Sequence, residues 1–216
     1  MWRRIIARNQ GSVLSRIRDP FGQALEVLRQ SVADGRHAPG RPIVIADEAR
    51  ALHLSTTPVR EALCWLGGEG LVERGGAGGF LALRLDATSL AQRYGFRRLC
   101  LLEMTARDPG EPPHGLISAT SPAQRLADLW RWRVRSIGDI ALYEAFASVQ
   151  GRLVRFAGAE AGLFSDLDAE AERMMGANPD EAAGLIGVYH DRRSAAAALL
   201  VLNAETEAAS QTGAEL

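Results

Sequence analysis

The sequence predicts a mainly α-helical protein with an N-terminal winged helix-turn-helix followed by a C-terminal all-helical bundle. Apolar residues recur at helical spacing along most of the chain, and strand-like patterns are confined to residues 42–45, 71–74 and 80–84. Ala, Leu and Gly dominate, while aromatic residues reach only 6%, which favours helices. The 216 residues suffice for one large or two small domains.

Residues 1–19 are predicted to form a basic arm ahead of the folded domains. Five arginines lie in this stretch against one acidic residue, Asp19, and Asn9 to Ser12 interrupt any helical pattern. Such an arm can be a solvated tail. It can also lie along the phosphates of a nucleic acid, because guanidinium groups neutralise phosphate charge.

Two helices are predicted next. Asp19-Pro20 suits the cap and first turn of a helix, and apolar residues follow at helical spacing until Gly35. A turn over residues 37–40 and an extended segment over residues 42–45 then lead to a short second helix. We expect this second helix over residues 46–53.

The third predicted helix has a polar start and an apolar stripe. Ser55 or Thr56 can cap it, and Pro58 suits the first turn because its missing N–H costs nothing there. Arg60 is expected to be exposed near this start. The apolar residues that share the inward face are Val59, Leu63 and Leu66.

A glycine-tipped β-hairpin follows the third helix. Residues 71–74 and 80–84 have the apolar or alternating pattern of strands, and Gly75 to Gly79 between them can only form a flexible tip. Three helices and such a hairpin make a winged helix-turn-helix. The tip is either a plain tight turn or a wing whose bare backbone enters the minor groove of DNA.

Beyond residue 85 the sequence predicts helices only. They are expected over residues 86–107, 121–136, 138–157, 160–175 and 179–204, with the chain fraying from Glu205. Prolines confine the one long loop to residues 108–120. The predicted domains are the arm (1–19), the winged helix-turn-helix (20–85) and a helical domain for dimerisation and effector binding (86–216).

Charge and residue usage narrow the function classes. All 25 basic residues are arginine, which excludes a Schiff-base lysine and a phosphate-loop lysine. Residues 1–85 hold 12 Arg against 8 acidic residues, and residues 86–216 hold 13 against 18. This asymmetry is typical of a nucleic-acid module joined to a domain with another task. No convergent catalytic constellation is visible, so we predict no enzyme activity.

The two cysteines indicate neither a disulfide framework nor structural zinc. Cys64 and Cys100 lack any CxxC or paired-His spacing, and their apolar neighbours predict inert core thiols. No apolar run approaches the length of a membrane span. We therefore expect a cytoplasmic protein with no membrane association and no cofactor.

The stretch from Pro20 to Arg84 resembles the DNA-binding domain of the GntR family of bacterial transcription regulators. The residues that carry the resemblance are Gly35, Pro39-Gly40, Ser55, Thr57 to Leu63, Glu69 to Val72 and the glycine-rich tip. The resemblance implies that the third helix is a recognition helix whose start enters the major groove. Where family members usually have Arg, Leu and Gly, this chain has Thr56, Glu48 and His53.

The resemblance also implies which residues contact DNA. Hydroxyls at the positive end of a helix dipole suit phosphate, and the Arg60 guanidinium can bond guanine O6 and N7. The alternative for Arg60 is an ion pair with Glu61 or Glu26. The expected DNA-binding residues are Arg50, Ser55, Thr56, Thr57, Arg60, Gly75 and Gly76.

The remainder is similar to FCD, the all-helical ligand-binding domain that follows this DNA-binding domain in one GntR subfamily. The similar segments are Arg97 to Glu103, Gly138 to Gly158 and Asn178 to His190. Members of the subfamily usually bind a divalent metal through one Asp and three His. The aligned positions here are Phe146, Gln150, Asp168 and His190, in a shorter spacing than usual. The resemblance thus implies a shortened, degenerate domain without a metal site.

An effector would then be held without metal. Phe146, Val149 and Leu153 are expected to supply apolar surface. The expected polar contacts are Arg97, Gln150 and His190, of which the arginine favours a carboxylate. For His190, a structural role beside Asp191 or Glu160 is the alternative.

The sequence is therefore interpreted as a sequence-specific, DNA-binding transcription regulator that forms a homodimer, most often a repressor in this family. Its expected partners are a double-stranded operator, a second copy of the chain and a small carboxylate effector. The alternative is an effector-independent or partner-controlled DNA-binding protein whose C-terminal domain only dimerises.

Overall fold

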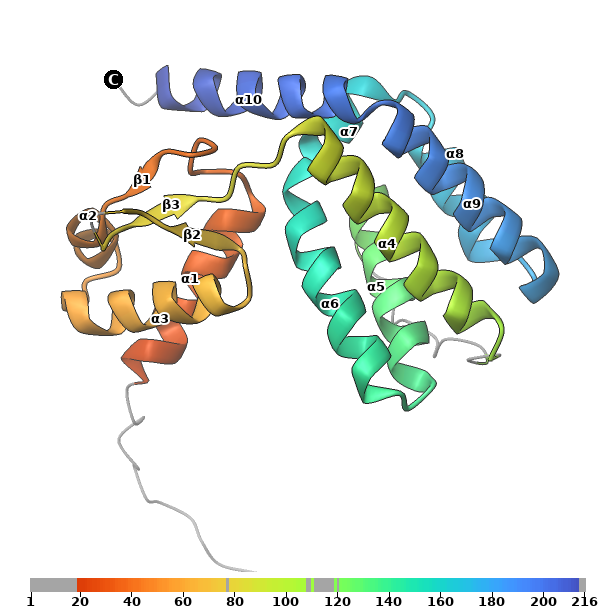
Figure 1. Ribbon diagram of the computed structural model, residues 1–216, viewed down its shortest axis with the longest axis horizontal. Helices are drawn as coiled ribbons and strands as arrows, with labels where there is room; N and C mark the ends of the chain where they lie inside the picture. The colour runs from red at the N-terminus through yellow and green to blue at the C-terminus, as the bar shows by residue number, and fades with distance from the viewer. Residues whose placement is uncertain (1–18, 77, 108–109, 111–118, 120, 214–216) are drawn as a thin grey trace, which may run out of the picture.

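The computed structural model describes residues 19–76, 78–107, 110, 119 and 121–213, and it confirms the predicted fold class (Figure 1). A winged helix-turn-helix precedes a domain built of helices. Apart from Asp19, the predicted arm lies outside the described residues, as does most of the predicted loop over residues 108–120. None of the helices in the described ranges is long and apolar enough to cross a membrane.

Three helices of the N-terminal domain are α1 (Pro20–Ala33), α2 (Ile45–Ala51) and α3 (Thr56–Gly68). Asp19 caps α1, because its Oδ1 accepts a hydrogen bond of 2.8 Å from the Gly22 backbone N–H. The second helix ends before the predicted residue 53. His53 instead adopts φ 54, a left-handed conformation that glycine reaches at lower cost.

A three-stranded antiparallel sheet completes this domain. Its strands are β1 (Pro42–Ile43), β2 (Val72–Arg74) and β3 (Phe80–Ala82), in the order β1-β3-β2. Both predicted hairpin strands are present, and Val72 pairs with Ala82. The apolar stripe of α3 packs with α1 and the sheet in one buried cluster that includes Leu28, Val59, Leu63 and Phe80.

The helices of the second domain differ in number and length from the prediction. They are α4 (Ala87–Thr105), α5 (Pro122–Ser136), α6 (Ile140–Leu153), the 3-10 turn η1 (Val154–Phe156), α7 (Ala157–Leu163), α8 (Leu167–Gly176), α9 (Pro179–Ala195) and α10 (Ala197–Gly213). The predicted helices over 86–107 and 121–136 correspond to α4 and α5. The predicted helix over 138–157 ends in the 3-10 turn η1. The predicted helix over 160–175 is divided between α7 and α8, which the extended Phe164 separates.

The predicted helix over 179–204 is two helices, and the expected fraying from Glu205 is wrong. The chain bends at Ala196 (φ −89, ψ 4), and α10 then continues across the N-terminal domain (Figure 1). Glu205 forms an ion pair of 3.3 Å with Arg84, and Ala208 is only 6% exposed. Packing of α10 on α7 and α4, together with this ion pair to the other domain, thus orders a segment that the local sequence predicts to fray.

Candidate nucleic-acid interface and interdomain cavity

The start of α3 is exposed. Ser55 is the N-cap residue, in an extended conformation (φ −73, ψ 164), and its side chain makes no capping hydrogen bond. Thr56 and Thr57 follow it, also exposed. The first turn of a helix has N–H groups without intrahelical partners. Three consecutive hydroxyls and these N–H groups are therefore available to an external acceptor such as a phosphate.

Arg60 lies one turn further along the same exposed side of α3. Within the part of the chain that the structure describes, it forms no ion pair, so the alternative pairing with Glu61 or Glu26 is not observed. It borders a shallow depression that also includes Cys64 and Trp65. A guanidinium so placed can extend into a groove of DNA without first breaking a protein contact.

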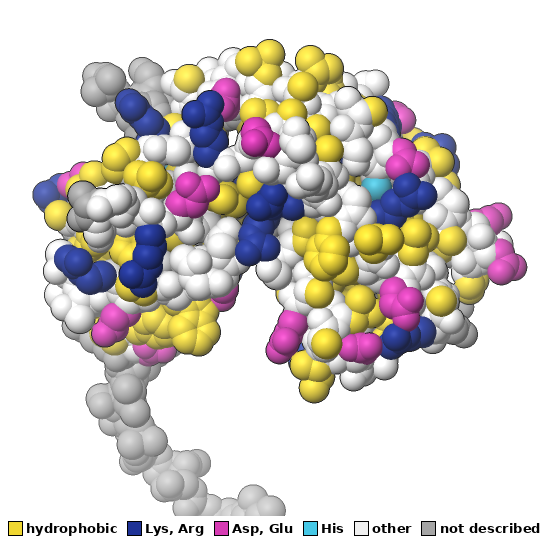
Figure 2. All heavy atoms as spheres, viewed as in Figure 1, with side chains coloured by type: hydrophobic (Ala, Val, Ile, Leu, Met, Phe, Trp, Pro, Cys, Tyr) yellow, Lys and Arg dark blue, Asp and Glu magenta, His cyan; other side chains and the backbone are white. Residues whose placement is uncertain are grey.

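Helix α2, which carries Arg50, and the end of the hairpin between β2 and β3 lie on the side of the N-terminal domain away from the helical domain, as does the start of α3 (Figure 1). Arg50 is exposed and pairs with Asp47 at 2.9 Å, a surface contact that costs little to exchange for a phosphate. In the tip, Gly76 is exposed, while the Gly75 N–H donates to the Gly79 carbonyl at 2.9 Å. Basic side chains are spread over this part of the surface (Figure 2).

The outer face of α3 differs from the sequence prediction at Cys64. This thiol was expected in the core, but it is exposed, and the Arg74 guanidinium lies 3.7 Å from its sulfur. The neighbouring Trp65 is 57% exposed, and its indole N–H donates to Glu69 at 2.7 Å. Apolar neighbours in sequence were a poor guide, since residues adjacent on a helix face different directions. Cys100 is buried as predicted.

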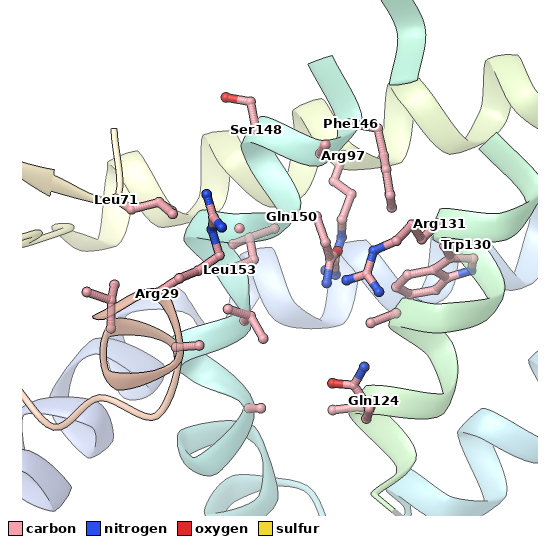
Figure 3. Close-up of a pocket in the computed structure, with 18 of the residues that line it drawn as sticks. Arg29, Leu71, Arg97, Gln124, Trp130, Arg131, Phe146, Ser148, Gln150 and Leu153 are labelled. Carbon is pink, nitrogen blue, oxygen red and sulfur yellow. The ribbon is translucent and has the colours of Figure 1, made fainter. Parts of the chain in front are cut away.

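A cavity of about 970 Å³ lies between the two domains. Arg29 and Leu71 of the N-terminal domain lie on one side, and Gln124, Trp130 and Arg131 of α5 lie on the other (Figure 3). Helix α6, from its middle to its C-terminal end, forms a further wall through Phe146, Gln150 and Leu153. Val149, an expected contact, packs instead in the core with α4 and α10.

Arg97 of α4 stands at the inner end of this cavity beside Gln150 (Figure 3). It is 3% exposed. Its Nε donates to His190 Nε2 at 3.0 Å and its Nη1 to Gln150 Oε1 at 2.9 Å, whereas Nη2 has no partner among the described residues. The ring centroids of Tyr94, Trp130 and Tyr189 lie 4.9–5.4 Å from its central carbon. No carboxylate in the described ranges compensates this buried cation directly.

His190 positions Arg97 and does not itself line the cavity. It is fully buried, and its Nδ1 lies 2.7 Å from the Ile186 carbonyl. Burial, reinforced by the neighbouring Arg97, lowers the pKa of His190 to about 2. The imidazole is therefore neutral, with the proton assigned to Nδ1 so that Nε2 can accept from Arg97. The hydrogen-bond partners of His190 are thus Arg97 and the Ile186 carbonyl, and not Asp191 or Glu160, which the sequence suggested.

The residues at the aligned metal positions do not fit a divalent metal ion. Phe146 contributes a buried apolar ring, and the acceptor atoms of Gln150 and His190 are already used by the guanidinium of Arg97. Asp168 lies elsewhere, exposed and paired with Arg125 at 2.8 Å. Throughout the described ranges, no three His, Cys, Asp or Glu side chains gather in a group that could hold a metal.

A second buried polar network was missed by sequence reasoning. Arg193 of α9 donates to Glu160 and to Glu170, each at 2.8 Å, and all three side chains are buried. The Tyr94 hydroxyl also donates to Glu160, at 2.6 Å. Glu170 belongs to an acidic stretch that looks solvated in sequence. The one signal of its burial in the sequence is its position four residues before Met174 and next to Ala171, which places Glu170 on the inner face of α8.

No family model and no curated protein matches the chain. Two solved structures are similar over 82% of this chain and 96% of their own length, each with a TM-score of 0.62. One is E. coli McbR/YncC, at 14% sequence identity. The other, at 19% identity, is described as a transcriptional regulator GntR from Rhodococcus sp. RHA1. These likenesses show the fold of the chain.

Proposed function

We propose that the chain is a non-catalytic, sequence-specific DNA-binding transcription regulator of the GntR type, acting as a repressor. The observation that carries this proposal is the exposed start of α3, which forms no ion pair among the described residues and lies on the same side of the domain as the glycine-rich hairpin. It is supported by a fold shared with a protein described as a GntR transcriptional regulator. The proposed domains are residues 1–19, 20–85 and 86–216.

In the proposed complex α3 enters the major groove. Ser55, Thr56 and Thr57 bond phosphates at the positive end of the helix dipole, and Arg60 reads a base edge. Arg50 neutralises a phosphate from α2. The backbone at Gly75 and Gly76 approaches the minor groove, where a side chain would hinder it.

The helical domain is proposed to dimerise and to sense a small molecule. A twofold dimer would place two α3 helices on two half-sites in inverted orientation. The buried guanidinium of Arg97, with one donor unpaired, suits a carboxylate effector. Gln150 lies at the same end of the cavity, and His190 orients Arg97 from behind. No metal is required in this arrangement.

The test of the function is the effect of Arg60→Ala on DNA binding. The duplex is selected from a random pool with the purified protein, and affinity is measured by fluorescence anisotropy over a range of salt concentrations. Loss of a bidentate base contact should cost about 1 to 3 kcal/mol and relax specificity at one position per half-site. Arg135→Ala, which removes an exposed arginine from α5, is the matched control and should leave binding unchanged.

If Arg60→Ala bound DNA with the same affinity and specificity as the unmodified protein, the proposal that α3 enters the major groove would be wrong. If only random duplex is shifted, and only at low salt, the protein is not a sequence-specific regulator.

A further inference from the structure

The interdomain cavity has walls from both domains. The α1 residues Glu26, Arg29, Gln30 and Ala33 line it on the N-terminal side, together with Glu69 and Leu71. The helical domain supplies α5, α6, the buried end at Arg97 and the buried carboxylate of Glu160, which is already bonded to Arg193 and Tyr94. A molecule that filled this space would therefore touch the DNA-binding domain as well as the helical domain.

The inner end of the cavity is built for one negative charge. Arg97 is nearly fully buried, its Nη2 has no partner among the described residues, and its bonded neighbours Gln150 and His190 are neutral. A buried charge without a counter-charge is costly, so an anion at this place gains more than it would in water. Trp130 and Phe146 beside it offer apolar surface.

The outer part of the cavity does not suit a second negative charge. Apart from Arg97, the two arginines that line the cavity already have carboxylate partners: Arg29 pairs with Glu69 at 2.7 Å and Arg131 with Asp128 at 3.1 Å. Glu26 and Glu144 are exposed at the cavity and form no ion pair within the described ranges. A dianion would place its far charge near these carboxylates, and like charges repel.

We propose that this cavity binds an amphiphilic monoanion that bridges the two domains. Its anionic group pairs with Arg97, its apolar body lies along Trp130 and Phe146, and its uncharged far end contacts α1 near Gln30 and Ala33. The proposal rests on the effector-binding part of the proposed function and adds the class of ligand and the role of α1. Because α1 packs on α3, occupancy would restrain the helix that supports the recognition helix.

The ligand class is tested on the full chain without DNA. Anilinonaphthalene sulfonate, a fluorescent aromatic monoanion, is the probe, and octanoate, octanol and octanedioate compete for its site. We expect one probe per chain. Octanoate should displace the probe at about tenfold lower concentration than octanol, because a hydrogen-bonded charge pair with Arg97 strengthens binding by about that factor. Octanedioate should compete at least as poorly as octanol.

The role of α1 is tested by filling the outer end of the cavity. Gln30→Trp places a large ring on the exposed cavity side of α1 without altering the core. It should weaken probe binding at least fivefold. Gln23→Trp, on the same helix but outside the cavity lining, is the matched control and should bind the probe as the unmodified chain does.

Equal competition by all three compounds would overturn the monoanion site, and equal probe binding by Gln30→Trp and Gln23→Trp would overturn the bridging position. Either result leaves the DNA-binding test with Arg60→Ala untouched. Conversely, if only the DNA-binding test failed, the chain would be a ligand-binding protein that does not recognise a DNA sequence.

Discussion

Arg97 and His190 show how one buried pair can fix the geometry of a site. The imidazole accepts from the guanidinium through Nε2, and its other nitrogen is held by the Ile186 carbonyl, so the ring cannot turn without losing both bonds. Protonation of His190 would place a second positive charge against Arg97 in a buried place. Burial and the neighbouring charge of Arg97 both disfavour the protonated imidazole, and they lower the pKa of His190 to about 2.

This coupling predicts that stability falls on mild acidification. Because the folded pKa of His190 lies below its unfolded value of 6.5, the unfolded chain takes up a proton that the folded chain excludes. The contribution of His190 to the free energy of unfolding is present above pH 6.5 and is lost progressively below it. At pH 5 the loss from this residue amounts to about 2 kcal/mol. Urea unfolding at pH 7, 6 and 5 measures the effect.

His190→Gln is the informative variant, since glutamine can accept from Arg97 and does not titrate. Its stability should vary less between pH 7 and 5 than that of the unmodified chain. His37, whose pKa is lowered mainly by burial, contributes in the same direction, so His37→Gln is measured in parallel. If His190→Gln retained the full pH dependence, His190 would not be the residue responsible.

At the scale of elements, α6 joins the cavity to the recognition helix. Arg152 follows Gln150 by two residues on this helix, and its guanidinium donates to the backbone carbonyls of Glu69 and Gly70 at 3.0 and 3.1 Å. These carbonyls lie at the C-terminal end of α3, where a helix carries partial negative charge and lacks internal donors. Arg152 thus caps α3 from the other domain.

We predict that Arg152→Met destabilises the chain by about 1 kcal/mol, because it removes charged donors from partly buried carbonyls. The operator affinity should fall as well, since α3 loses a support at its C-terminal end. Unfolding in urea and anisotropy with the selected duplex measure the two effects. Arg135→Met is the control. Equal behaviour of both variants would mean that α6 does not support α3.

At the scale of the whole molecule, the helical domain leaves apolar side chains uncovered. Phe96 and Leu99 of α4, Val188 of α9, and Leu199 and Leu202 of α10 are exposed. Figure 2 shows apolar side chains at the surface in the region of α4 and α10. Exposed apolar patches of this kind mark interaction surfaces in soluble proteins.

A second copy of the chain is the partner that the proposed function requires. We predict that light scattering at micromolar concentration gives twice the chain mass of 23.3 kDa, and that Leu99→Arg shifts the protein to monomer by burying an unpaired charge. Ile140→Arg, at an exposed apolar residue at the start of α6, should remain dimeric. A monomeric unmodified chain, or a dimeric Leu99→Arg, contradicts this interface.

The sequence by itself determined the elements whose signals are local. The cap at Asp19, the helical spacing in α1, α3 and α5, and the glycines between β2 and β3 predict these helices and the hairpin, because each signal depends on residues a few positions apart. The polar start of α3 also follows from this local pattern, whereas the candidate DNA contacts were implied by the resemblance to the GntR family.

Only the tertiary structure decided how α10 and the interior of the helical domain are arranged. The order of α10 depends on its packing against α7 and α4, which are far away in sequence. The bond between Arg97 and His190 joins residues 93 positions apart, and the cavity requires α1 and α5 to face each other across two domains. The burial of a polar group and the choice of its partner depend on long-range packing, which local periodicity does not encode.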